Sequence, residues 1–173
     1  DRIILVSRRG QGILFEESQA RPMGRSASGV RGIKLREGDA LVALDVVKND
    51  ASSLLTVLQN GFGKRTRIKN HFKPQNRGGM GIRASKTSQK TGNVVEAMII
   101  EGDDGDLVLV SREGQTIRIK LKSAKPLGRD TQGVTLMRLK KDDKVASVTL
   151  VRESEDEAVV VPDSGVSVAI STK

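Results

Sequence analysis

Cysteine, tryptophan and tyrosine are absent from the 173 residues of this chain, while phenylalanine occurs three times and histidine once. Without cysteine there is no disulfide and no thiolate ligand, and the single histidine, His71, has no second imidazole with which to hold zinc. Without tyrosine there is no phenolic nucleophile, and no serine has a neighbouring base in the sequence pattern. We therefore expect no catalytic residue, no metal and no cofactor.

Long apolar runs are also missing. No stretch approaches the roughly 20 residues that cross a bilayer, and no signal-peptide pattern opens the chain. We expect a cytoplasmic protein that makes no membrane contact.

Acidic residues are fewer than basic residues. The chain carries 30 Lys and Arg against 21 Asp and Glu, a net charge of +9. Such a balance is typical of proteins with an acidic polymer as partner, most often nucleic acid. The alternative at this point is a soluble basic protein without such a partner.

A pattern of Pro-x-x-Arg-x-x-x-Gly followed by Val or Ile occurs three times, each copy 52 residues after the last. The copies are Pro22, Arg25 and Gly29, then Pro74, Arg77 and Gly81, then Pro126, Arg129 and Gly133. A period near 50 residues indicates a repeat architecture. The three arginines share one structural column, so they could bind phosphate or equally join one repeat to the next.

Each repeat contains four short apolar runs. The first two flank a turn centred on Gly10, Gly61 or Gly114, and the next two follow the Pro/Arg/Gly pattern, as in "GVRGIKL" (29–35) and "ALVALDVV" (40–47). The first pair predicts a hairpin. We predict an all-β, propeller-like β-pinwheel with about three four-stranded antiparallel blades of roughly 50 residues, and little helix.

We divide the chain at residues 1–52, 53–103 and 104–152 into blades 1, 2 and 3. Residues 153–173 form an acidic segment that is either a partial fourth copy or a tail able to pair with an edge strand. The sequence leaves open whether the blades close or form an open arc, and what the acidic segment does.

Positive charge is concentrated in the middle repeat. Residues 53–100 carry nine basic side chains and one acidic residue, Glu96, whereas the flanking repeats mix the two signs. A solvated surface normally mixes signs, so the middle repeat favours phosphate binding.

Few aromatic residues are available to bind bases. Single-strand and RNA readers stack bases on aromatic side chains, and this chain offers only Phe15, Phe62 and Phe72. No helix-turn-helix, zinc finger or basic zipper is visible. Contact with the backbone of duplex DNA is the better fit.

The most glycine-rich stretch is "PQNRGGMG" (74–81). Its glycines would let the backbone approach a phosphate, with successive amides forming an anion-binding concavity and Arg77 adding a forked contact. The alternative is a tight turn in which glycine serves backbone angles only. In so basic a repeat we favour phosphate contact.

Four stretches resemble the C-terminal β-pinwheel domain of bacterial DNA gyrase A. They are "RPMGRSASGVRGIKLREGD" (21–39), "LTVLQNGFGKRTRI" (55–68), "PQNRGGMGI" (74–82) and "GRDTQGVTLMRL" (128–139). The resemblance implies a ring or spiral of blades whose basic rim bends duplex DNA around itself, which lets gyrase introduce negative supercoils. It also implies three partners: double-stranded DNA, the ATPase (B) subunit, and the remainder of gyrase A. The location implied is the cytoplasm, at the nucleoid.

The gyrase family's box motif reads Gln, basic, Arg, Gly, Gly, basic, Gly. Gln75, Arg77 and the three glycines match it, but Asn76 and Met80 stand where basic residues are usual. The chain resembles the last three of six blades, so residues 74–81 are a later-blade relative of the box. Topoisomerase IV carries related blades and stays open as the parent. Type IIA topoisomerases cleave DNA with a tyrosine, so the resemblance implies that this chain is an accessory domain and not itself an enzyme.

The predicted DNA contacts centre on the middle repeat and extend to both neighbours. They are Lys64, Arg65, Arg67, Lys69, Lys73, Gln75, Arg77, Gly78, Gly79, Gly81, Arg83, Arg25, Arg31, Lys120, Lys122, Lys125 and Arg129. The rival class is a propeller whose charge serves an acidic protein partner, and an RNA-binding platform is disfavoured by the scarcity of aromatics.

Overall fold

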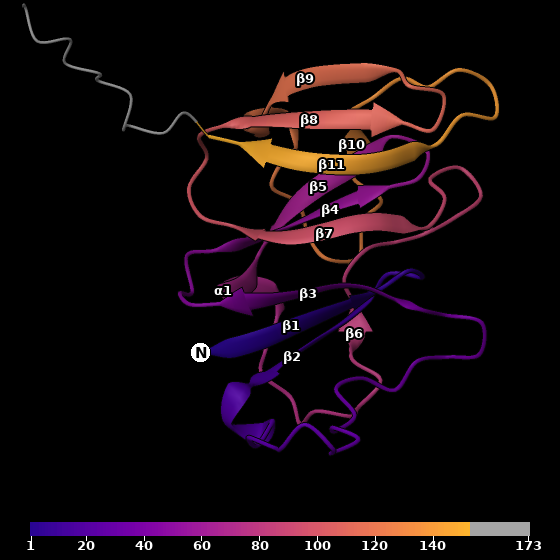
Figure 1. Ribbon diagram of the computed structural model, residues 1–173. Coiled ribbons are helices and arrows are strands. Elements are labelled where there is room, and N and C mark those ends of the chain that lie inside the picture. The colour runs from indigo at the N-terminus through magenta and orange to yellow at the C-terminus, as the bar shows by residue number, and fades with distance from the viewer. Residues whose placement is uncertain (153–173) are drawn as a thin grey trace, which may run out of the picture.

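A computed structural model describes residues 1–152 of the chain (Figure 1). Eleven strands form in this part of the chain, with one α-helical turn, α1 (Ile68–His71), and two short 3-10 turns. The strands are β1 (Arg2–Ser7), β2 (Gln11–Glu16), β3 (Leu41–Val47), β4 (Ser53–Leu58), β5 (Phe62–Arg67), β6 (Ile82–Arg83), β7 (Val94–Ile100), β8 (Asp106–Ser111), β9 (Thr116–Lys120), β10 (Val134–Thr135) and β11 (Val145–Val151). The expected fourth copy or tail, residues 153–173, lies outside the described residues.

The predicted hairpins are β1–β2, β4–β5 and β8–β9, all antiparallel. Their turns place Gly10, Gly61 and Gly114 at φ of 82°, 84° and 85°. Residues with a Cβ rarely adopt this left-handed region, which is why glycine recurs there.

Neighbouring repeats exchange strands. The first sheet has the order β3-β1-β2-β6 and the second β10-β5-β4-β7, so each receives a short strand from the repeat that follows it. The third sheet, β11-β8-β9, has three strands within the described residues. We call these sheets blade 1, blade 2 and blade 3; they follow one another along the molecule (Figure 1). Two of the sheets contain strands from two repeats, so sheets and sequence repeats do not share boundaries. The division of the chain at residues 1–52, 53–103 and 104–152 stays a prediction.

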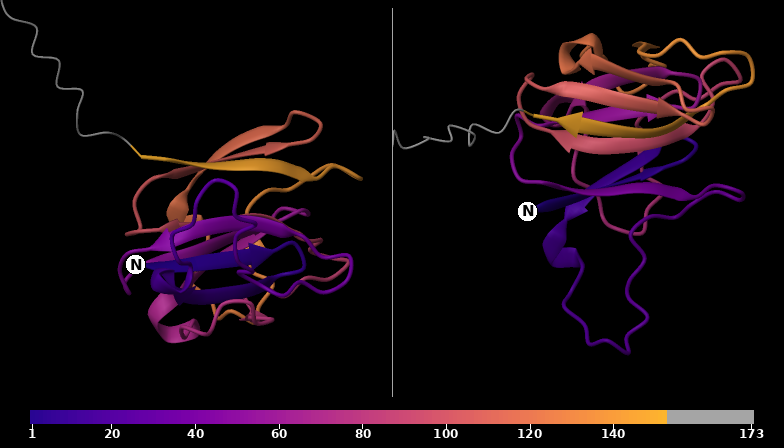
Figure 2. Two further views of the ribbon diagram at one scale, coloured as in Figure 1. Left: turned by 60° about the horizontal axis from the view of Figure 1, so that its bottom comes forward. Right: turned by 45° about the horizontal axis from the view of Figure 1, so that its top comes forward.

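The expected strand over 29–35 does not form. Its counterparts in the later repeats, β6 and β10, exist only where they pair with the edge of the preceding blade. No earlier blade lies beside 29–35 in the described chain, so this segment lacks the neighbouring strand whose ladder of hydrogen bonds would make it a strand. The loop that contains this segment extends away from the sheets (Figure 2, right).

The core lies between the blades. One apolar cluster joins blade 1 to blade 2 and includes Ile4, Val6 and Ala97. A second joins blade 2 to blade 3 and includes Leu55 and Val148. Each blade is therefore stabilised mainly by burial against the next. Within residues 1–152 no helix is long and apolar enough to cross a membrane.

Candidate nucleic-acid interface

Two long connections run side by side over one face of the molecule, which we call the outer face. The segment 68–90 connects β5 to β7, and the segment 121–135 connects β9 to the turn before β11. The amide of Lys86 donates to the carbonyl of Thr131 (3.0 Å), and the amide of Leu127 donates to the carbonyl of Arg65 (2.8 Å). These backbone bonds fix the outer segments of blades 2 and 3 against each other.

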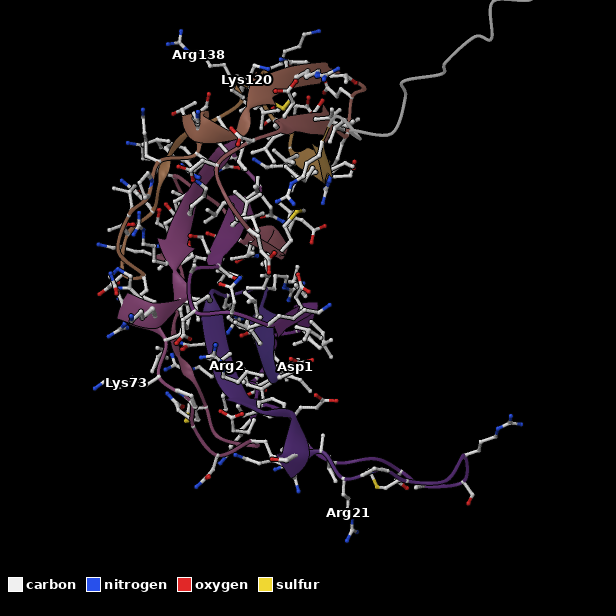
Figure 3. The ribbon with its side chains drawn as sticks, turned by 90° about the vertical axis from the view of Figure 1, so that its left-hand side faces the viewer. Asp1, Arg2, Arg21, Lys73, Lys120 and Arg138 are labelled. Carbon is white, nitrogen blue, oxygen red and sulfur yellow. The ribbon has the colours of Figure 1, made fainter. Side chains whose placement is uncertain are left out.

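Exposed basic side chains gather on these segments. Figure 3 shows many nitrogen tips along the margin of the molecule that carries Lys73. These basic side chains include the exposed Arg67 (at the end of β5), Lys69, Lys73, Arg83, Lys86, Lys122 and Lys125, with Arg129 half-buried beside them. We call these eight residues the basic rim. Its charges come from two neighbouring blades.

Within residues 1–152, six of the eight rim residues have no ion-pair partner: the exposed Arg67, Lys69, Lys73, Lys86 and Lys125, and the half-buried Arg129. Of the rest, Arg83 pairs with Asp130 at 2.7 Å, and Lys122 lies 3.8 Å from Asp104. The hydrogen bond from Arg83 holds the pKa of Asp130 below its usual value. Most of the rim is therefore available to an external anion.

Lys64 does not belong to the exposed rim. Its side chain is fully buried, and its ammonium group donates to the carbonyls of Gly128 (2.7 Å) and Arg129 (2.6 Å) and to the Thr131 hydroxyl (3.2 Å). Burial lowers the pKa of Lys64 to about 8, an effect that Asp130 partly opposes. The predicted direct contact with DNA does not fit this burial. Lys64 instead holds the 128–131 segment of the rim in place.

Arg65 is the second correction. Only 5% of it is exposed, and its guanidinium donates to the carbonyl of Ala124 (2.6 Å) and pairs with Asp103. This buried guanidinium joins β5 to the 121–135 segment and to the loop between β7 and β8, and it offers little surface to a phosphate.

The glycine-rich stretch serves as an interblade turn. The Gly78 amide donates to the carbonyl of Gly32 (2.6 Å), and the Arg77 amide donates to the side chain of Gln19 (2.8 Å). Gly81 has φ of 68° and sits against the carbonyl of Gly12, with no room for a Cβ. Two successive amides are thus already paired, and the expected phosphate concavity does not fit this arrangement.

The repeated arginines link one repeat to the one before it. Arg77 donates from Nε to the carbonyl of Gln19 (2.8 Å) and from Nη1 to that of Arg31 (3.1 Å). Arg129 makes the equivalent contact with the carbonyl of Arg83 at 3.4 Å. The interblade role left open by the sequence is supported, with carbonyl groups in place of an ion pair.

The remaining predicted residues are not members of the rim. Arg25 and Arg31 are exposed on the extended loop before β3, and Gln75 is half-buried with its backbone amide bonded to the carbonyl of Leu14. Lys120 is exposed on β9 but pairs with Asp106 at 2.9 Å. Lys86 was missing from the predicted contacts. The sequence around Lys86 does not indicate that it lies beside the other rim residues. It does so because its backbone amide is bonded to the carbonyl of Thr131, which is distant in sequence.

The strand-exchanged blades with a basic outer face define a propeller-like domain, and comparisons identify which kind. Residues 1–48, 53–101 and 105–152 match the family described as the DNA gyrase C-terminal domain, a β-propeller. The chain belongs to this family, which confirms the resemblance and the fold class predicted from the sequence.

Individual relatives agree. The gyrase A protein of Staphylococcus aureus strain MRSA252 is 44% identical over 146 residues, and that of strain NCTC 8325 is 44% identical over 147. Each match covers 84% of this chain but 16% of the relative. The chain therefore corresponds to a small part of those proteins.

Two solved structures share the fold. A DNA gyrase A C-terminal domain superposes with a TM-score of 0.78 at 30% identity, over 87% of this chain and 50% of that one. The C-terminal domain of a DNA topoisomerase IV gives 0.79 at 21% identity, over 87% and 46%. The second likeness concerns the fold alone.

Proposed function

We propose that this domain binds the phosphate backbone of duplex DNA without strong sequence preference and bends the duplex along its outer face. The observation that carries this proposal is the basic rim, with exposed Lys and Arg on the adjoining outer segments of two consecutive blades. Most of these side chains lack an ion-pair partner within residues 1–152. Each phosphate contact releases counterions, and the contacts together hold the bend.

The positions of the phenylalanines support duplex over single-stranded partners. Phe15 and Phe72 are 3% exposed and belong to the core, and Phe62 is half-buried with the Lys90 ammonium 5.7 Å from its ring centre. No other aromatic ring except His71 exists in the chain to stack on a base. Phosphate contact is then the main source of affinity.

In this proposal the domain is an accessory part of a gyrase-type topoisomerase. It would work with the remainder of gyrase A and with the ATPase (B) subunit, in the cytoplasm at the nucleoid. Wrapping DNA over the rim would support supercoiling, whereas cleavage falls to another part of the enzyme because this chain has no tyrosine. A topoisomerase IV parent is the alternative, in which the rim would steer the choice of DNA segment.

A charge-matched pair of variants tests the proposal. Lys69, Lys73 and Lys125 are replaced together by Gln in one variant, and the exposed Lys48, Lys140 and Lys141 in the control. Both variants lose three positive charges, so any difference in DNA affinity between them reflects where those charges lie. Fluorescence anisotropy with a duplex of about 40 base pairs should show affinity reduced at least tenfold in the rim variant and much less in the control.

Equal losses in the two variants would mean that net charge, and not the rim, determines binding. Wild-type chain that does not bind duplex DNA would favour the rival, an acidic protein partner. Both variants change exposed lysines only, so circular dichroism should show the wild-type fold.

A further inference from the structure

A cavity of about 610 Å³ lies at the end of the molecule that carries α1. Its lining comes from three segments: residues 50–53 at the start of β4, residues 67–70 at the end of β5 and in α1, and residues 102–103 between β7 and β8. In Figure 1 this end of the molecule is on the left. The volume lies within the range of sites that hold a small ligand or one unit of a polymer.

Four polar residues of this lining have side chains without a partner in the described protein. Within residues 1–152, no side-chain hydrogen bond and no ion pair is made by Ser53, Arg67, Lys69 or Asn70. Two of these side chains carry a positive charge, and the other two offer hydrogen-bond donors, an amide and a hydroxyl. Together they suit an anion with several acceptor oxygens, as a phosphate group has.

Two carboxylates also line the cavity, but an arginine neutralises each of them. Asp50 pairs with Arg2 at 2.6 Å, and Asp103 pairs with the buried Arg65. With the two unpaired cations, this makes four positive charges against two negative ones, a net charge of +2. The carboxylates therefore do not cancel the attraction of the cavity for an anion.

The equivalent place in blade 1 is acidic. Glu16 is the counterpart of Arg67, because each is the last residue of the hairpin's second strand and pairs with the first residue of the other strand. The 3-10 turn that follows has Ser18 where α1 has Lys69. A phosphate group at this place in blade 1 would meet a carboxylate, so blade 1 has no counterpart of the cation pair.

In blade 3 the equivalent place is positive, but its charges are paired within the blade. Lys120 is the counterpart of Arg67, and Asp106 is the counterpart of Ser53. Asp106 pairs with Lys120 at 2.9 Å and with Arg118 at 2.6 Å. Among the three described blades, blade 2 alone combines unpaired cations here with a hydroxyl in place of a carboxylate.

We propose that the cavity beside α1 is a phosphate-binding pocket. Arg67 and Lys69 supply its charge, and Asn70 and Ser53 donate hydrogen bonds to the phosphate oxygens. Since Arg67 and Lys69 belong to the basic rim, the expected occupant is a backbone phosphate of the bound duplex, and this choice of occupant rests on the proposed function. A small phosphorylated ligand has the same chemistry and is the other source of such a group.

Inorganic phosphate is the probe, added to the labelled full-length chain at constant ionic strength and followed by the NMR shifts of backbone amides. The shifts should change at the three lining segments and little along the rest of the rim. Asn70→Asp places a carboxylate in the pocket at almost unchanged size and should weaken phosphate binding about tenfold or more. Asn76→Asp, the matched control at another exposed asparagine, should change the affinity by less than about twofold.

Adding duplex DNA to the phosphate-bound chain identifies the source of the occupant. Displacement of phosphate from the pocket would support a backbone phosphate, whereas phosphate that stays bound beside the duplex would support a small phosphorylated ligand. Shifts spread evenly over the whole rim, or equal phosphate affinity in the two asparagine variants, would overturn the pocket. A chain that binds duplex but no phosphate would overturn it too, while phosphate binding without duplex binding would refute only the proposed function.

Discussion

Lys64 shows how far a single residue can depart from its usual role. Its equivalents in the other two repeats, by strand register, are Ile13 and Ile117. The lysine keeps the buried place of Ile13 but carries a charge, which three oxygens of the 128–131 segment satisfy. Lys64 therefore contributes to the rim indirectly, because it holds in place the segment that carries Arg129.

Replacing Lys64 with Met tests this role. Met removes all three donors and leaves buried carbonyls unpaired, which should lower the free energy of unfolding by about 1–3 kcal/mol at pH 7. The native pKa of about 8 lies below the usual 10.5, so between these values the unfolded chain binds the proton and the native chain does not. Stability relative to the Met variant should therefore rise with pH in this window, by up to about 1.4 kcal/mol per pH unit. Urea denaturation at several pH values measures both effects, and a difference that shrinks as pH rises would contradict them.

The arginine column supplies a second residue-scale prediction. Arg77→Ala loses two bonds to carbonyls of the preceding repeat and should cost about 1–2 kcal/mol of unfolding free energy. Arg25→Ala is the control, because Arg25 is exposed and has no hydrogen-bond partner within residues 1–152; its cost should stay below about 0.5 kcal/mol. Thermal denaturation measures both, and equal costs would rule out the interblade role.

These residues also mark what the sequence can predict. The repeat spacing identified the arginine column, and the structure shows what it holds. Burial of Lys64 and Arg65 could not be foreseen, because lysine and arginine are almost never fully buried unless paired. Their partners, Thr131 and Asp103, are distant in sequence and only the fold brings them close.

At the scale of elements, strand exchange is the main feature that sequence reasoning missed. The apolar runs correctly placed the hairpins and the long strands β3, β7 and β11. A repeat period gives the length of a unit, but it does not say which copy of a strand pairs with which sheet. β6 and β10 are two residues long, so their pairing depends on turn geometry and on close approach to glycine more than on hydrophobic pattern.

A pair of glycine variants isolates the exchange. Gly81 and Gly29 are equivalent and have φ of 68° and 78°, so alanine strains the backbone about equally at both, by roughly 1–2 kcal/mol. Only at Gly81 would the new Cβ overlap a carbonyl, that of Gly12, next to the β2–β6 pair. Gly81→Ala should therefore lower the free energy of unfolding by about 2 kcal/mol more than Gly29→Ala. Chemical denaturation compares them, and similar costs would mean that the close packing of β6 contributes little.

At the scale of the whole molecule, the rim depends on the order of the blades. The middle repeat is the most basic segment of the sequence, and the fold sets its outer connection beside that of blade 3. Charges that are far apart in sequence, such as Lys73 and Lys125, become parts of one surface. Composition predicted a phosphate-binding surface, but it could not tell which basic residues belong to that surface. The structure shows that some of them are buried.

The salt dependence of duplex binding by the wild-type chain tests the central claim most directly. Anisotropy titrations with two duplexes of about 40 base pairs and unrelated sequence would be repeated over a series of salt concentrations. If the five exposed rim residues without an ion pair each contact a phosphate, the logarithm of the association constant should fall with that of the salt concentration with a slope of about −4 to −5, the same for both duplexes. A slope near zero, or steep binding to one sequence only, would contradict an account in which the rim holds the phosphate backbone.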